Sequence, residues 1–109
     1  MFVFTITLSI VFALAGIVKV FRAKPMVDQF KEFGLPTFAV QIVGTLEVAG
    51  AVGLLMPSFK VYAAIGLFIL MIGAVFNHIK VKHPIKTILP AFVLGLASIV
   101  LIILLLKEA

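Results

Sequence analysis

Four long apolar stretches, separated by short polar segments, dominate the pattern along this chain. They cover about residues 2–21, 37–56, 61–78 and 88–106. An α-helix needs ~20 mainly apolar residues to cross the ~30 Å hydrocarbon core of a bilayer, and each stretch approaches that length. Pro57 and Ser58 leave only a tight turn between the second and third stretches, so these two helices are expected to be antiparallel neighbours. The pattern predicts an all-α membrane protein, a single domain built as a four-transmembrane-helix antiparallel bundle.

The segment between the first and second stretches has a different pattern. Pro25 suits the first turn of a helix, and Gly34 suits the position just after its end. Between them Phe30 and Phe33 recur at helical spacing, with charged residues on the other faces. A short amphipathic helix is therefore predicted at about residues 25–33. It is either a linker lying on the membrane surface or a lid folded over a cavity in the bundle.

Composition supports the membrane assignment and excludes other classes. The chain has 109 residues, of which 64% are hydrophobic and 12% charged, whereas soluble domains are about 45–50% apolar and about 25% charged. One core of this size cannot hide so much apolar surface, so a lipid bilayer must cover the rest. The net charge of +5 comes from residues between the spans, so no nucleic-acid partner is expected. The absence of cysteine excludes a disulfide or a thiolate metal site in this chain.

The distribution of basic residues predicts the orientation of the chain in a cell membrane. Seven of the nine fall on one side of the predicted bundle, namely Lys19, Arg22, Lys24, Lys31, Lys80, Lys82 and Lys86. Cytoplasmic loops collect lysine and arginine, so the first and third loops are expected in the cytoplasm and both termini outside. Residues 13–15 resemble a signal-peptide cleavage site, but no basic residue precedes the apolar stretch, so we expect this segment to be retained as a span.

Glu47 is the strongest candidate for a functional residue, because it is a lone carboxylate within the second apolar stretch. A charged group near the bilayer centre costs ~2.5–3.5 kcal/mol or more unless it is paired, protonated or beside water. Lys19 lies at the end of the first span, on the same side as the start of the second. Its long side chain can either reach the lipid headgroups or turn inward as the partner of Glu47. Gln41, nearer the membrane surface, is a candidate ligand contact.

Asn77 and His78 end the third span on that same side of the membrane. Asn77 is a second candidate ligand contact. A histidine at a helix end is commonly interfacial, but it changes charge near neutral pH, so His78 and Glu47 can also belong to a proton path. His83, in the following loop, is expected to be solvated. The two histidines lack the spacing of a zinc or haem pair, and no metal site is expected.

Small residues recur along the last three spans, including Gly44, Gly50, Gly73 and Gly95. Small side chains let membrane helices approach closely, and we interpret most of them as packing positions. The same faces can also support a homodimer, if they are not consumed within one bundle.

A series of motifs covers nearly the whole chain and resembles the DoxX-like family. The motifs are Gly16-x-x-Lys19, Met26-Val27-x-x-Phe30, Gly34-x-Pro36, Gly44-x-x-Glu47-x-x-Gly50-Ala51, Leu54-Leu55-x-Pro57, Gly73-Ala74 and His78. The resemblance implies a four-helix membrane bundle with Lys19, Glu47 and His78 as its recurrent polar positions. That family is named for its similarity to a membrane subunit of thiosulfate:quinone oxidoreductase. Its more distant relatives act as receptor-assembly chaperones.

Three functions are consistent with these residues and this resemblance. The first is an accessory subunit of a quinone-linked membrane redox system, in which Glu47 meets a quinone or another small apolar ligand, Lys19 tunes its charge and His78 connects it to the cytoplasm. This hypothesis requires a redox partner subunit. The second is a small proton-coupled transporter of lipophilic compounds. The third is a non-catalytic assembly factor, in which Glu47 and Lys19 only lock the bundle together.

Overall fold

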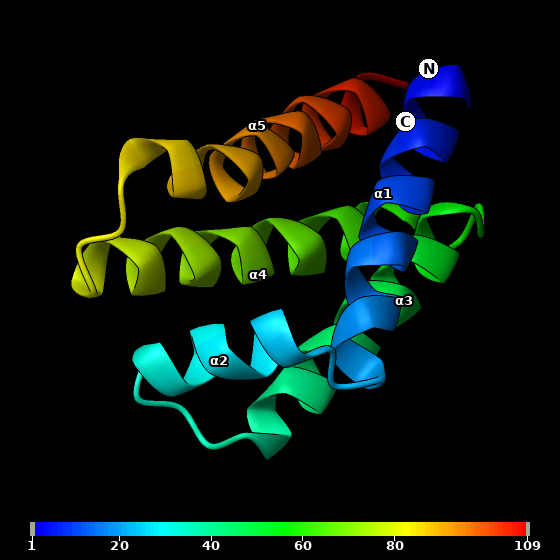
Figure 1. Ribbon diagram of the computed structural model, residues 1–109. Coiled ribbons are helices and arrows are strands. Elements are labelled where there is room, and N and C mark those ends of the chain that lie inside the picture. The colour runs from blue at the N-terminus through cyan, green and yellow to red at the C-terminus, as the bar shows by residue number, and fades with distance from the viewer. Residues whose placement is uncertain (1, 109) are drawn as a thin grey trace.

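A computed structural model describes residues 2–108, with the side chains of residues 2–107. These residues form five α-helices and no strand, which confirms the predicted all-α fold (Figure 1). The helices are α1 (Phe2–Val20), α2 (Lys24–Glu32), α3 (Phe38–Leu54), α4 (Lys60–Lys80) and α5 (Ile85–Glu108). Four of them are apolar, and α2 is the short helix predicted between the first and second spans.

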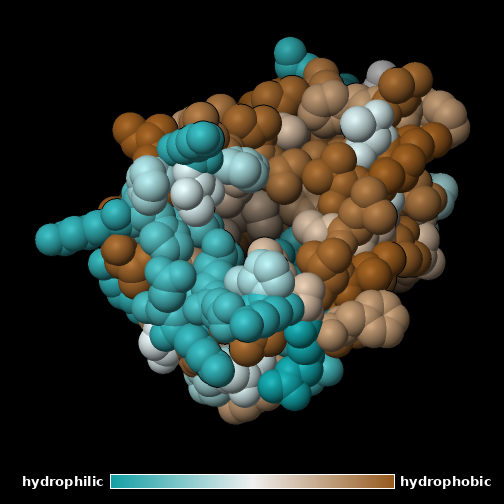
Figure 2. Space-filling model, viewed as in Figure 1, coloured by the Kyte–Doolittle hydropathy of each residue, from teal (hydrophilic) through white to brown (hydrophobic). Residues whose placement is uncertain are grey.

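Three helices, α1, α4 and α5, are long and apolar enough to cross a membrane. The fourth apolar helix, α3, has 17 residues and is shorter than the stretch predicted at residues 37–56, because the chain turns over residues 55–59 before α4 begins. At 1.5 Å per residue α3 is ~26 Å long, at the lower end of the lengths that span a bilayer. Large apolar side chains remain exposed along all four helices, and Figure 2 shows the resulting continuous hydrophobic surface. The chain is thus a small helical membrane protein.

The four long helices are arranged as two antiparallel pairs, α1 with α3 and α4 with α5, joined through α3 and α4 (Figure 1). The tightest approach is between α1 and α3, where a Cβ atom added to Gly16 would lie 2.6 Å from the carbonyl oxygen of Gly44. Glycine at both positions lets the two backbones touch, which is how apolar helices associate within lipid. Phe12, Leu67 and Leu101 are fully buried where the helices meet.

We call one end of the molecule the basic end: it comprises α2, the C-terminal ends of α1 and α4, and the N-terminal ends of α3 and α5. Figure 2 shows hydrophilic side chains gathered over this end, against the hydrophobic surface of the rest of the visible face. The amphipathic helix α2 does not lie apart from the bundle, because Phe30 and Phe33 are both buried and pack with Val40 of α3. This packing fixes α2 beside the long helices.

Three helices at the basic end finish with the same backbone motif. After each last turn one residue takes a left-handed conformation, at Arg22 (φ 56°), Gly34 (φ 78°) and Lys82 (φ 60°). The next amide then donates to a carbonyl five residues earlier, as from His83 N to His78 O at 3.0 Å. This is the Schellman arrangement, which satisfies free carbonyls at a helix end and reverses the chain. The chain reversals after α1 and α4 direct α2 and α5 back towards the bundle.

Candidate functional site

A cavity of about 440 Å³ opens among all five helices near the basic end. Its walls are mainly apolar, with side chains of α2, α4 and α5 such as Phe30, Met71 and Leu94. A few polar groups also line it. They include Lys19 from α1, Glu47 from α3, and Asn77 and His78 from α4. An apolar cavity with a few convergent polar groups is the usual form of a small-molecule site.

Lys19 and Glu47 form an ion pair across the α1–α3 contact. Lys19 Nζ lies 2.6 Å from Glu47 Oε1, and the Glu47 side chain is only 1% exposed. The structure therefore turns Lys19 inward to Glu47 instead of outward to the headgroups. The close crossing at Gly16 and Gly44, within three residues of each partner, brings the two side chains within reach.

The other carboxylate oxygen of Glu47 is unusual. Oε2 is buried and has no hydrogen-bond partner among the described residues. Leaving a buried charged oxygen unpaired is costly, since it has lost its hydration without replacement. Glu47 lines the cavity, and Oε2 is the oxygen of its carboxylate that is left to accept a hydrogen bond.

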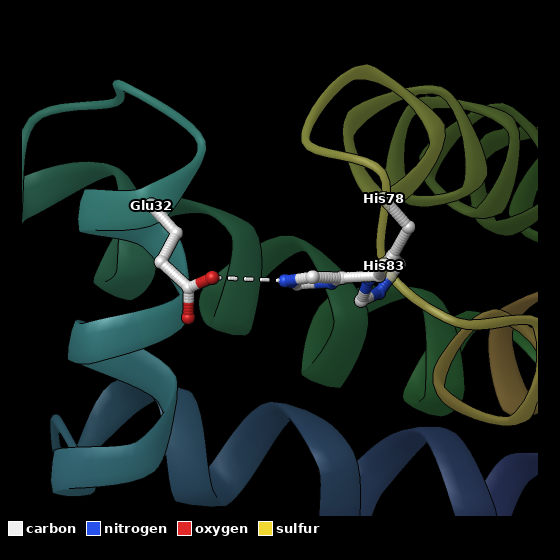
Figure 3. Close-up of polar contacts among 3 residues, drawn as sticks. All are labelled: Glu32, His78 and His83. Atoms are coloured by element: carbon white, nitrogen blue, oxygen red, sulfur yellow. Dashed lines mark hydrogen bonds and ion pairs between the residues drawn. The ribbon is translucent and has the colours of Figure 1, made fainter.

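His78 is part of a second polar group, shown in Figure 3. Its Nδ1 atom lies 2.7 Å from Nδ1 of His83, and His83 Nε2 lies 3.0 Å from Glu32 Oε2. The prediction that His83 is solvated is wrong, because its side chain is only 14% exposed. The three residues come from α4, the α4–α5 loop and α2.

The Schellman motif at the end of α4 explains why the two histidines meet. In this motif the residue two positions beyond the cap packs against the one three positions before it, and these positions are His83 and His78. The contact was not predicted from the sequence, because Lys82, not glycine, occupies the left-handed position. Pro84, just after the motif, was the available signal, since proline often follows a helix end.

The two predicted ligand contacts are placed differently. Asn77 lines the cavity, and its side-chain amide donates to the carbonyl of Gly73 at 2.9 Å. Gln41 is exposed and does not line the cavity; its amide donates to Val20 O at the end of α1, at 3.1 Å. The structure therefore separates Gln41 from the other candidate residues and gives it a role in joining α1 to α3.

Helix α2 covers the cavity, as the lid interpretation expected. Phe33 packs edge-on against the His78 ring, with ring centres 5.2 Å apart. Lys80 Nζ donates to the Phe33 carbonyl at 2.8 Å, which ties the end of α2 to α4. Phe30 and Phe33 also form part of the cavity wall. A purely superficial linker would make none of these contacts.

The described residues can hold a neutral or weakly polar molecule better than a metal ion. Among residues 2–108 there is no group of three or more histidine, cysteine or acidic side chains arranged to ligate a metal. Lys19, Asn77 and His78 can instead offer hydrogen bonds to carbonyl or hydroxyl groups, and Glu47 Oε2 can accept one. The site suits a compact ring bearing oxygen atoms, with an apolar remainder among the aromatic walls.

The fold and the composition are those of a small helical membrane protein, and comparison with known proteins agrees with this class. Residues 3–100 match the DoxX-like family. The match covers most of the chain, and the protein therefore belongs to the DoxX-like family, as its motifs suggested.

One similar protein is known from Bacillus subtilis (strain 168). It is the uncharacterized protein YdgD, 29% identical over 102 residues, which are 89% of this chain and 90% of that protein. No solved structure matches the chain.

Proposed function

We propose that this protein binds the head group of a lipid-soluble quinone in the cavity beneath α2, as an accessory membrane subunit of a quinone-linked redox system. The proposal depends above all on the unpaired, buried Oε2 of Glu47 in a mainly apolar cavity. This oxygen can accept a hydrogen bond from the reduced, quinol form of the head group, whose hydroxyls donate. With the basic end in the cytoplasm, as the charge distribution predicts, the head group would lie near the cytoplasmic surface of the membrane.

The residues of the cavity fit such a molecule in both shape and polarity. A volume of about 440 Å³ falls within the ~300–1,000 Å³ typical of small-molecule sites. Lys19 and His78 offer hydrogen-bond donors on different walls, and the aromatic rings of Phe30 and Phe33 offer flat apolar surfaces. A quinone takes up protons together with electrons when it is reduced.

The chain itself would position the head group and control its protons. Glu47 is held by Lys19 through Oε1, so its Oε2 keeps a fixed position from which to accept a hydrogen bond. Lys19 balances the charge of Glu47, which keeps the carboxylate tolerable within the membrane. His78 lines the cavity and has Nδ1 tied to His83, so Nε2 is the ring nitrogen that would hydrogen-bond to the head group. Phe33 closes the site against water.

Two glycines of α4 provide a matched test. A Cβ atom added to Gly73 or to Gly66 would meet nothing within 4 Å, but only Gly73 lines this cavity. Gly66 instead borders a separate groove between α3 and α4. Gly73→Leu should therefore fill the cavity, and Gly66→Leu makes the same chemical change outside it.

The measurement is equilibrium binding of a radiolabelled decyl-substituted benzoquinol, kept reduced without oxygen, to purified protein in lipid discs, with empty discs subtracted. We expect saturable binding to wild type and to Gly66→Leu, and an affinity at least about tenfold weaker, ~1.4 kcal/mol, in Gly73→Leu. Glu47→Gln should weaken binding as well. Equal binding by both leucine variants, or none above empty discs, would exclude the cavity as a quinone site.

A second candidate, a non-catalytic assembly factor, is favoured by one observation. The Lys19–Glu47 pair lies beside the close approach of α1 and α3 at Gly16 and Gly44, where it can lock the two helices together. Glu47→Gln should lower protein yield and thermal stability under either function, but an assembly factor should bind no quinol even as wild type. A Glu47→Gln protein of normal yield and stability would count against it.

A further inference from the structure

We propose that Glu32, His83 and His78 form a proton path between water at the basic end and the cavity. The path is defined by the geometry of these three residues alone. Its use as a proton supply for a bound quinone rests on the proposed function.

The three side chains are linked in the order Glu32, His83 and His78, and Figure 3 shows how they lie. The Glu32 side chain is 60% exposed, the His83 side chain 14%, and His78 only 6%. The two links between them, 3.0 Å and 2.7 Å, are both of hydrogen-bond length. His78 then lines the cavity. No other group is needed to connect its two ends.

The short contact between the two Nδ1 atoms restricts where protons can sit. Only one of the two atoms can donate in this hydrogen bond, so a single proton lies between the rings. When His78 holds that proton and is neutral, its Nε2 is an acceptor towards the cavity. When His83 holds it and His78 is neutral, His78 Nε2 carries a hydrogen and is a donor. The two histidines therefore change tautomer together.

Proton transfer outward from the cavity balances without any further reactant. His78 Nε2 takes up a proton, and the bond from His78 Nδ1 to its hydrogen breaks as His83 Nδ1 gains that hydrogen. His83 then loses the hydrogen on Nε2 to the Glu32 carboxylate, which releases it to water. Delivery into the cavity is the same sequence in reverse. After one passage both rings hold the opposite tautomer, so the path must be reset by ring rotation or by a return transfer.

The groups around the path leave Glu32 as its connection to water at the basic end. Lys80 of α4 is tied to the Phe33 carbonyl, and Lys19 of α1 is held by Glu47 across the cavity. The Phe33 ring lies against both imidazole rings and shields them from bulk water. Glu32 is thus the exposed group through which protons enter or leave the histidine pair.

The same contacts could instead serve only to latch α2 over the cavity, and two variants separate these roles. Glu32→Gln can still accept a hydrogen bond from His83 but cannot take up its proton. His83→Gln keeps a polar side chain and the backbone amide that donates to His78 O. Asp28→Asn is the matched control, because Asp28 is an exposed acid on α2 with no ion pair or hydrogen bond among the described contacts.

The experiment is nuclear magnetic resonance of ¹⁵N-histidine-labelled protein in lipid discs, without added quinone. Wild type and Asp28→Asn should show an N–N coupling across the hydrogen bond between the two rings. A positioned proton donor or acceptor contributes ~10²–10⁴-fold to a transfer rate, so exchange of the His78 ring proton with water should slow by at least about tenfold in Glu32→Gln and in His83→Gln.

Equal exchange rates in all four proteins would overturn the path, whether or not the coupling is present. Slowing of the same size in Asp28→Asn would overturn it too, since the loss of a negative charge on α2 would then be sufficient to slow the exchange. Because no quinone is present, neither outcome bears on whether the cavity binds one.

Discussion

Removing Lys19 while leaving Glu47 in place is the sharpest test of the ion pair. In Lys19→Met the Glu47 carboxylate, 1% exposed, would lose the 2.6 Å contact that compensates its charge. Breaking a buried pair in this way costs about 3–5 kcal/mol, mostly because the remaining charge is buried and alone. The Lys19 side chain is 15% exposed, so some water can reach the site. We therefore expect the free energy of unfolding to fall by about 3 kcal/mol, near the lower end of that range.

The complementary variant should be milder. In Glu47→Gln a neutral amide can still accept a hydrogen bond from Lys19, and Lys19 can also extend towards water. We expect a loss of about 1–2 kcal/mol for this change. In the double variant Lys19→Met/Glu47→Gln no charge remains, so its loss should fall below the sum of the two single losses by about 2 kcal/mol.

The assay is the temperature at which detergent-solubilised protein loses its monodisperse peak in size-exclusion chromatography. A loss of 1 kcal/mol lowers the midpoint by ~4–8 °C in a small domain, so Lys19→Met should unfold roughly 12–24 °C below wild type. Lys24→Met, at an exposed lysine of α2, is the control and should change the midpoint little. Equal midpoints for Lys19→Met and Lys24→Met, or strictly additive losses in the double variant, would refute a buried, coupled pair.

Three further predictions follow from the helix contacts. Gly44→Ala should lower stability by about 1–3 kcal/mol in the same assay, because its Cβ would lie 2.7 Å from Gly16 O, whereas Gly73→Ala, with open space, should not. Lys82→Gly should raise the unfolding midpoint, since it removes a left-handed strain of ~1–2 kcal/mol at φ 60° and retains the helix end; a lower midpoint would contradict this reasoning. Since the chain has no cysteine, Ala74→Cys places a single thiol in the cavity wall. This thiol should react with maleimide faster in combination with Phe33→Ala than in combination with the control Phe38→Ala, which changes an exposed phenylalanine of α3. Equal rates would mean that Phe33 does not close the cavity.

Hydrophobic periodicity was sufficient to predict the helical membrane fold, because four apolar stretches of near-spanning length leave few alternatives. The position of α2 along the chain was predictable from Pro25 and Gly34. Whether it lies on the membrane surface or packs against the other helices was not. Whether an amphipathic helix lies on lipid or over protein depends on what its apolar face meets. Phe30 and Phe33 pack against α3, and Phe33 also contacts the two histidines.

The candidate site was only partly predictable for a similar reason. Glu47 stands out in any hydropathy pattern, and Lys19 is the nearest cation on the correct side. The link from His83 to Glu32 joins residues 51 positions apart, and it depends on the backbone reversal at Lys82. Lysine gives no sequence signal for a left-handed conformation, so that reversal, and the histidine contact it creates, could be found only in three dimensions.

The charge balance of the cavity bears on which ligand the site can accept. Glu47 is compensated by Lys19, so the pair adds no net charge to the cavity wall. A lipophilic cation would have to displace Lys19 to reach the carboxylate, and would leave that ammonium without a partner inside the membrane. A neutral molecule needs no such exchange, because it can use Oε2 of Glu47 while Oε1 stays bound to Lys19. The geometry of the pair therefore favours a neutral ligand with a hydroxyl donor, such as the proposed quinol, over the cationic substrates of a proton-coupled exporter.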